Sequence, residues 1–222
     1  MVSKAQEAFD NNAKDIQRLI DLHQQEGGEA RGRRYGLEVL NKSAVVLITA
    51  FWEAYCEDIA SEGLEHIVNH ARSSDALPAE LKKQIANKVK KSPHDLEVWK
   101  ISDDGWRIYL RAHLEEMKEE RDRKLNTPKT KQINDLFKVA IGIDNISKSW
   151  SWARKMTAER ASKKLDKYVT LRGSIAHRGA DNNTVKKADV VDYFEFTKLL
   201  VSKTGGKVNS HVKTITGKPL WE

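Results

Sequence analysis

The chain has 222 residues, of which 39% are hydrophobic and 32% charged, and its formal net charge is +7. We expect one domain over residues 1–222, because this length buries a core without disulfides or metals. The longest apolar run, near Ala44–Thr49, is far shorter than the roughly 20 residues of a membrane span. Cys56 is the single cysteine, which excludes a disulfide framework. The N-terminus lacks an apolar signal core, so we expect a cytoplasmic protein with no membrane segment.

The positive charge is distributed unevenly. Residues 1–75 carry 8 basic and 13 acidic side chains, residues 76–156 carry 18 and 12, and residues 157–222 carry 13 and 7. A basic carboxyl-terminal two thirds fits a polyanionic partner such as nucleic acid. The alternative is an ordinary solvated helix surface, because many of these charges alternate in sign.

Apolar residues recur at helical spacing along the first half of the chain. The first predicted helix begins at a capping box of Ser3 and Gln6 and ends at Gly27. The second is the most apolar, and we expect Trp52 to lie in its buried stripe. A third helix follows Pro78.

The same spacing continues in the second half. A fourth helix is predicted from Trp106, and a fifth over Ile133–Ile141. A sixth begins near Thr157, and a seventh begins near Asp189 and is interrupted at Gly205-Gly206. No segment shows strand alternation. The sequence therefore predicts an all-α bundle of about six to seven helices, with Trp150 and Trp152 covering one end.

No motif in the sequence supports metal binding or phosphate binding by a glycine-rich loop. His66 and His70 have the i, i+4 spacing of a metal-binding pair, but no third ligand is evident, which favours two surface histidines. Glycine-rich phosphate-binding loops are also missing from the sequence. We therefore predict no metal and no cofactor.

The strongest chemical signal lies in the segment Leu171–Gly179. Arg172 lies on the inward face of an otherwise apolar helix, where an arginine is costly unless it meets an anion or a carboxylate. His177 closes the segment and can exchange a proton near neutral pH. Five residues span about 140° around a helix and about 7.5 Å along it. Either the helix loosens at Gly173, or two chains bring their pairs together across a two-fold axis.

This segment resembles the Arg-x4–6-His signature of the HEPN superfamily of small helical nucleases. The rest of the chain is similar to one branch, the RiboL-PSP-HEPN type, over roughly residues 35–205. The similar segments, in chain order, are Ala50–Tyr55, Thr127–Ile133, Leu136-Phe137, Ile141–Ile143, Ser149-Trp150 and Leu165–Val169.

The resemblance implies a metal-independent endoribonuclease that works as a homodimer through the Arg172/His177 face. His177 would be the general acid and base, and Arg172 would stabilise the phosphoryl charge as the RNA 2′-OH attacks. We expect Arg178 and Ser174 to hold substrate, and Glu53 to pair with Arg172 or to orient His177. RNA is the expected partner, and a cognate regulatory protein is a second. Phage defence, toxin–antitoxin systems and stress response are the settings that the resemblance implies.

One position departs from the superfamily pattern. Its active members usually carry a polar residue, commonly asparagine, directly after the arginine, and here that residue is Gly173. This favours an alternative hypothesis, a catalytically silent HEPN module that dimerises and binds RNA or a partner. A third option is a protein that neutralises a toxin.

Overall fold

The computed structural model describes residues 2–27, 36–122, 125, 127–152, 156–178 and 184–222. No β-strand occurs within these ranges, which confirms the predicted all-α bundle. None of the helices in these ranges combines the length and apolar character needed to cross a bilayer. The α-helices are α1 Lys4–Gly27, α2 Glu38–His70, α3 Ala79–Lys91, α4 Gly105–Asp122, α5 Thr130–Ile141, α6 Ala158–Arg178 and α7 Lys187–Thr216, and the short 3-10 helices are η1 Ser74–Ala76, η2 Asp95–Ile101 and η3 Ile146–Ser149.

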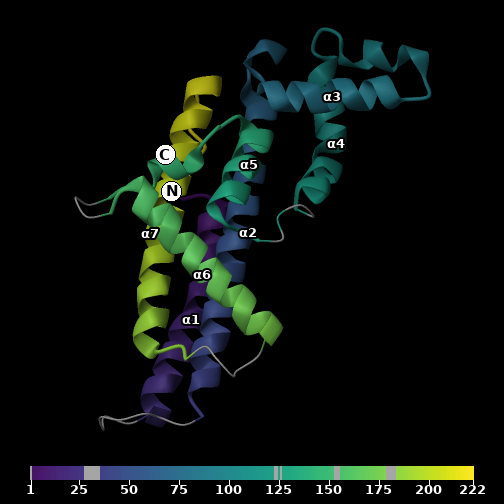
Figure 1. Ribbon diagram of the computed structural model, residues 1–222. Coiled ribbons are helices and arrows are strands. Elements are labelled where there is room, and N and C mark those ends of the chain that lie inside the picture. The colour runs from purple at the N-terminus through teal and green to yellow at the C-terminus, as the bar shows by residue number, and fades with distance from the viewer. Residues whose placement is uncertain (1, 28–35, 123–124, 126, 153–155, 179–183) are drawn as a thin grey trace.

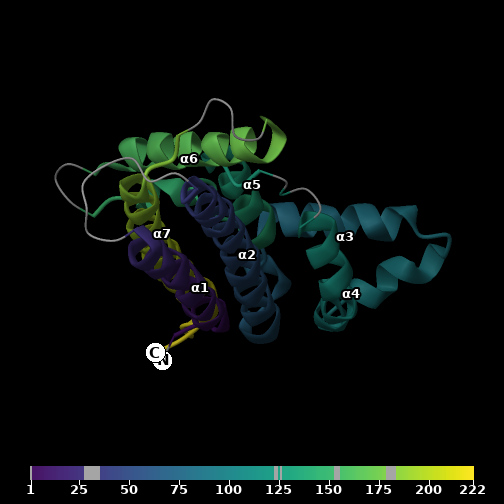
Figure 2. The ribbon, with the colours of Figure 1, turned by 90° about the horizontal axis from the view of Figure 1, so that it is seen from below.

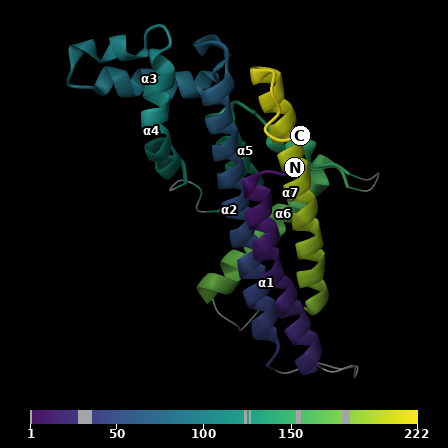
Figure 3. The same cartoon turned by 180° about the vertical axis from the view of Figure 1, so that it is seen from behind.

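Three long helices, α1, α2 and α7, run side by side and form the body of the molecule (Figure 1). Helix α6 crosses this layer on the side opposite α1 (Figure 2), and the view from behind shows α1 uncovered (Figure 3). Residues 79–122, which contain α3, η2 and α4, project from the C-terminal end of α2. We call these residues the arm.

The core of the body is centred on α2. Trp52 is fully buried, as predicted, and its ring lies 5.8 Å from that of Trp150. Trp150 is also fully buried, and its indole N–H donates to the Thr204 hydroxyl at 2.9 Å. The sequence placed Trp150 at one end of the bundle, but the contact with α7 places it in the core.

Helix α7 continues through Gly205 and Gly206, where the sequence predicted an interruption. A Cβ atom at Gly205 would lie 2.7 Å from the Tyr55 hydroxyl oxygen. Glycine therefore allows α7 to approach α2 closely, and the Tyr55 hydroxyl donates to the Val201 carbonyl at 2.9 Å. Because this packing supports the helical backbone, the cost of glycine in a helix is offset.

The predicted cap of α1 forms in part. The Gln6 backbone N–H donates to the Ser3 hydroxyl at 3.0 Å. The Gln6 side chain donates to Asp10 instead of returning to the cap, so only half of the capping box is present.

Candidate functional site around Arg172

The sequence of α6 determines where this helix begins and which of its faces packs onto the body. The Thr157 hydroxyl accepts from the Arg160 backbone N–H at 3.3 Å, which satisfies one free donor at the start of the helix. Ala161 and Leu165 are fully buried at helical spacing, so one face of α6 packs onto the body. This face also carries Tyr168 and, one turn later, Arg172.

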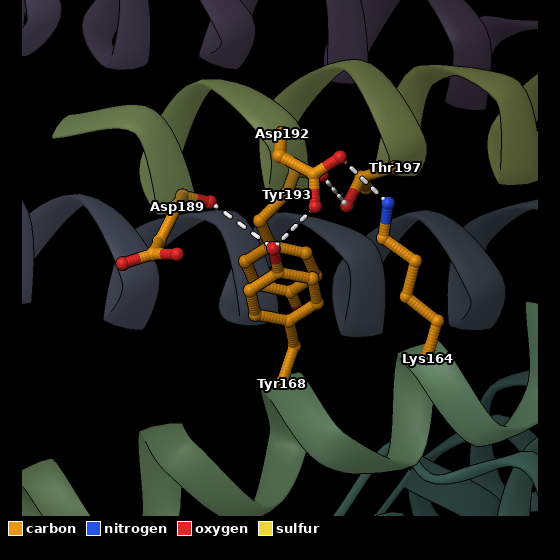
Figure 4. A network of polar contacts seen from close by, with 6 residues as sticks. All are labelled: Lys164, Tyr168, Asp189, Asp192, Tyr193 and Thr197. Carbon is orange, nitrogen blue, oxygen red and sulfur yellow. Dashed lines mark hydrogen bonds and ion pairs between the residues drawn. The ribbon is translucent and has the colours of Figure 1, made fainter. Parts of the chain in front are cut away.

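A polar network fixes α6 against α7 (Figure 4). Asp192 accepts from the Tyr168 hydroxyl at 2.6 Å and from the Lys164 ammonium at 2.7 Å. Partial burial raises the pKa of Asp192, but the hydrogen bonds from Lys164 and Tyr168 outweigh it and the pKa is lowered. Burial and the neighbouring carboxylate raise the pKa of Tyr168, so this hydroxyl remains a donor. Asp192 is therefore an ionised acceptor that holds two side chains of α6.

Stacked tyrosines extend this network to α2. The rings of Tyr168 and Tyr193 lie 4.0 Å apart at an interplanar angle of 10°. The Tyr193 hydroxyl lies 3.0 Å from the Thr49 hydroxyl, which itself donates to the Val45 carbonyl. Tyr193 therefore donates to Thr49. The three helices α2, α6 and α7 meet here, one turn before Arg172.

Arg172 is half-buried on α6. Its positive charge acts to lower the pKa of Glu53 on α2 and that of Tyr193 on α7, although burial raises both. Burial raises the pKa of the Glu53 carboxyl, and the charge of Arg172 only partly opposes this rise. The charge of Arg172 thus acts on Glu53, and the pairing of these two residues stays a prediction.

One donor of Arg172 is unused. Its Nε atom is buried and has no hydrogen-bond partner among the described residues. A buried N–H without an acceptor costs about 1–3 kcal/mol. A guanidinium also matches the oxygens of a phosphate in its geometry. The Nε donor of Arg172 is therefore unsatisfied by the described residues.

His177 does not share a face of α6 with Arg172. The helix is continuous through residues 171–178, so the loosening at Gly173 that the sequence allowed does not occur. The position of His177 in an unbroken helix is about 140° around the axis from Arg172. The side chains of His177 and Arg178 lie outside the described part of the chain, and both residues are placed by helix position alone.

The two small residues after Arg172 differ in what surrounds them. A Cβ atom at Gly173 would meet nothing within 4 Å, so a larger side chain has room there. The Ser174 hydroxyl donates to the Thr170 carbonyl of its own helix at 3.3 Å. Ser174 is about 200° from Arg172 around the axis, which does not bring it to the Arg172/Glu53 pair.

A polar groove of about 630 Å³ lies beside α6, against α5. Asp166 lines this groove and accepts from both the backbone N–H and the hydroxyl of Thr130, at 2.8 and 2.9 Å. It thereby caps α5, so one of the family-like segments of the sequence has a structural role here. The described residues contain no group of three or more side chains suited to hold a metal ion.

The sequence reasoning missed Asp192, Tyr193 and Thr49. Asp192 lies next to apolar positions of α7, and a single acidic residue there is ordinary. Its role depends on Lys164 and Tyr168, which come from another helix. The sequence indicated this network only through the inward position of Tyr168. A buried tyrosine hydroxyl usually finds a hydrogen-bond partner.

Comparison with known proteins gives one match. A family model described as RiboL-PSP-HEPN matches residues 8–210. No curated protein and no solved structure matches the chain.

Proposed function

The chain belongs to the RiboL-PSP-HEPN family, and from this premise we propose that it is a metal-independent endoribonuclease. The observation that carries the proposal is Arg172, a partly buried arginine with an unused donor next to Glu53. A leucine would fill the same space at a lower desolvation cost than a core-facing guanidinium. It is expected where an anion has to be bound.

The proposed reaction uses the RNA itself as the nucleophile. The 2′-OH attacks the adjacent phosphorus and loses its proton to a base, and the bond from phosphorus to the 5′ oxygen breaks. The leaving oxygen takes up a proton, so the products are a 2′,3′-cyclic phosphate and a 5′-hydroxyl. His177 transfers these protons as general base and acid. Arg172 stabilises the charge that builds up on the phosphoryl oxygens.

Glu53 has a positioning role in this scheme. The charge of Arg172 acts on its carboxyl, and in this proposal the ionised carboxylate holds the guanidinium in place. Its raised pKa follows from burial, which the Arg172 charge does not fully offset. Arg178 and Ser174 are proposed to contact substrate further along α6.

The separation of Arg172 and His177 on one helix supports a site made by two chains. A two-fold axis near the end of α6 places Arg172 of one protomer beside His177 of its partner. We propose a homodimer of this kind. A cognate protein that covers this face would regulate the enzyme by blocking the pairing.

The exposed face of α6 offers a path for RNA. Arg160, Lys163 and Lys167 are exposed and lie within about 60° of one another around the axis. Lys163 pairs with Glu159, and both side chains are about three quarters exposed, so this pair is weak and easily exchanged for a phosphate. The three cations lead toward the end of α6 that carries His177.

The test is RNA cleavage in excess EDTA, with mixed tRNA and rRNA as substrate. Wild-type protein is expected to leave fragments with 2′,3′-cyclic phosphate ends, and His177→Ala and Arg172→Lys are expected to lose cleavage by at least about 100-fold. Arg18→Lys makes the same change at an exposed arginine of α1, outside the proposed site, and is the matched control. Cleavage that needs added metal, or that survives in His177→Ala, contradicts the proposal.

Gly173 favours the second candidate function, a silent RNA-binding or partner-binding module. Because a Cβ atom there meets nothing within 4 Å, Gly173→Asn and Gly173→Ala are both expected to fold. Cleavage that appears only in Gly173→Asn would show that the wild-type chain is silent for lack of this polar side chain. RNA retained in a shift assay without cleavage by any variant would favour a purely binding role.

A further inference from the structure

The arm is a firmly attached part of the fold. Leu81, Ile85 and Val89 bury one face of α3, and Trp106 and Leu110 are buried on α4. The Arg107 guanidinium donates to the carbonyls of Val68 and Ala71, where α2 ends. A cation at a helix C-terminus also interacts favourably with the helix dipole. The arm is therefore a rigid projection.

Large apolar side chains are exposed where η2 and α4 pack together. Leu96 and Trp99 are 73% and 71% exposed, and their spacing of three places both on one face of a 3-10 helix. Ile108 is 71% exposed and Val98 is 53% exposed. We call Leu96, Val98, Trp99 and Ile108 the apolar tip. A leucine and a tryptophan exposed on one face of a helix are typical of an interface, and exposed tryptophans are frequent anchors of interfaces.

Opposite charges are separated within the arm. Helix α3 carries five lysines and one glutamate. Residues 92–104 carry four carboxylates and one lysine, and that lysine, Lys100, pairs with Glu97. Lys90 and Lys91 are exposed on α3, whereas Asp95 and Asp104 are exposed beside the apolar tip. In the described part of the arm, no ion pair joins these lysines to these aspartates.

We infer that the apolar tip is an interface with a second copy of this chain, in which each tip lies against α3 of the other copy. A two-fold axis makes such a contact twice, so both basic helices meet both acidic tips. The apolar side chains supply the buried centre and the charges supply the rim, which is the usual anatomy of an interface. Trp99 is the anchor.

The charge beside Trp99 decides between a protein and RNA as the occupant. An exposed tryptophan can stack on a base, but such sites lie in positively charged grooves. Asp95, Asp103 and Asp104 surround this tip with negative charge, which repels phosphates. A basic protein surface is the complementary partner, and α3 of a second copy is such a surface.

The first experiment measures molar mass by light scattering on the full chain, across a dilution series. The double variant Leu96→Ser/Trp99→Ser is expected to have half the mass of wild type, at concentrations where wild type is assembled. Leu199→Ser on α7 removes a side chain that is 41% exposed and is the matched control, with unchanged mass. Wild-type mass in the tip variant, or a single-chain mass of 25.3 kDa for wild type throughout, overturns the inference.

A charge exchange makes the test independent of folding defects. Lys90→Glu/Lys91→Glu is expected to halve the mass, and adding Asp95→Lys/Asp104→Lys is expected to restore it. Asp103 is left unchanged because its φ of 49° is strained for most side chains. Failure of the combined variant to reassemble contradicts the inference. Loss of RNA binding in the tip variant at unchanged mass would assign the tip to nucleic acid instead.

This interface is separate from the proposed ribonuclease. The tip variants are to be assayed for RNA cleavage in parallel, and the result for mass stands whether or not cleavage is found. If both the α6 face and the arm assemble, each chain has two different contacts, and the tip variant reverts to the dimer formed through α6.

Discussion

The body and the arm differ in how far their tryptophans are buried. In the body, Trp52 of α2 and Trp150, which follows η3, are fully buried and pack edge to face although they are far apart in the sequence. In the arm, Trp106 is buried whereas Trp99 is 71% exposed on a short helix. The body therefore buries these two tryptophans within one chain. The arm has apolar surface left over, which its own chain does not cover.

The body and the arm also differ in whether their charged groups find partners within the chain. In the body, Asp192, Tyr168 and Lys164 satisfy one another and fix α6. In the arm, the exposed lysines of α3 and the aspartates beside η2 remain apart. A region whose charges are matched internally has a structural role, and one whose charges are left unmatched is suited to a partner. Arg172 and Trp52 are exceptions in the described part of the body, since the Nε atom of Arg172 and the Nε1 atom of Trp52 are buried without an acceptor.

The largest expected effect comes from comparing two tryptophans. Trp52→Ala removes a fully buried side chain and is expected to lower the free energy of unfolding by about 3–5 kcal/mol. Trp99→Ala removes an exposed side chain and is expected to change it by less than about 0.5 kcal/mol in the unassembled chain. Urea unfolding of both variants at low protein concentration measures the difference. Equal losses of unfolding free energy in the two variants would contradict the different roles of tryptophan in the body and the arm.

A smaller effect is expected at the junction of α6 and α7. Tyr168→Phe keeps the stacked ring but removes the hydrogen bond to Asp192, which is worth about 1 kcal/mol of unfolding free energy. Lys163→Met breaks an exposed pair on the same helix and is expected to cost less than about 0.5 kcal/mol. Denaturant unfolding compares them. If the proposed site depends on the placement of α6, RNA cleavage also falls in Tyr168→Phe, and not in Arg18→Met, which breaks an exposed ion pair on α1.

The sequence predicted the elements of the fold better than their partners. The spacing of apolar residues located the helices, and Trp52 was expected in the core. Trp150 was misplaced because its stretch has no helical period, so its partners Trp52 and Thr204 were invisible in the sequence. The interruption predicted at Gly205 fails because Tyr55 packs there. Such contacts join residues about 50 to 150 positions apart, which local patterns do not report.

The candidate site was predictable in its residue types and not in its arrangement. Arg172 was expected to face inward because its helix is otherwise apolar on that side, and Glu53 was suggested as its partner. The roles of Asp192 and Tyr193 depend on how α6 crosses α7, which is a property of the assembled bundle.

Substitution of Gly173 is expected to raise the free energy of unfolding, whereas the substitutions above lower it. Gly173 lies inside α6, where glycine is less favourable than alanine by about 0.5–1 kcal/mol, and a Cβ atom would meet nothing within 4 Å. Gly173→Ala is therefore expected to raise the unfolding free energy by about this amount. Gly205→Ala is the contrasting variant, because its Cβ atom would lie 2.7 Å from the Tyr55 oxygen, and it is expected to destabilise. Thermal unfolding that shows the same sign for both would contradict the packing described for α7.

The smallest effect is a pH dependence at Glu53. Burial raises the pKa of this carboxyl in the folded chain, and Arg172 opposes the rise only in part. The folded chain therefore holds the proton more tightly than the unfolded chain, and the stability that this provides at low pH is lost as pH rises through the raised pKa. Glu53→Gln is expected to match wild type most closely in acid and to gain relative stability toward neutral pH. Glu65→Gln, an exposed position on α2, is the control. Unfolding measured from acid to neutral pH checks the sign, and a relative gain toward acid would mean that Arg172 outweighs burial.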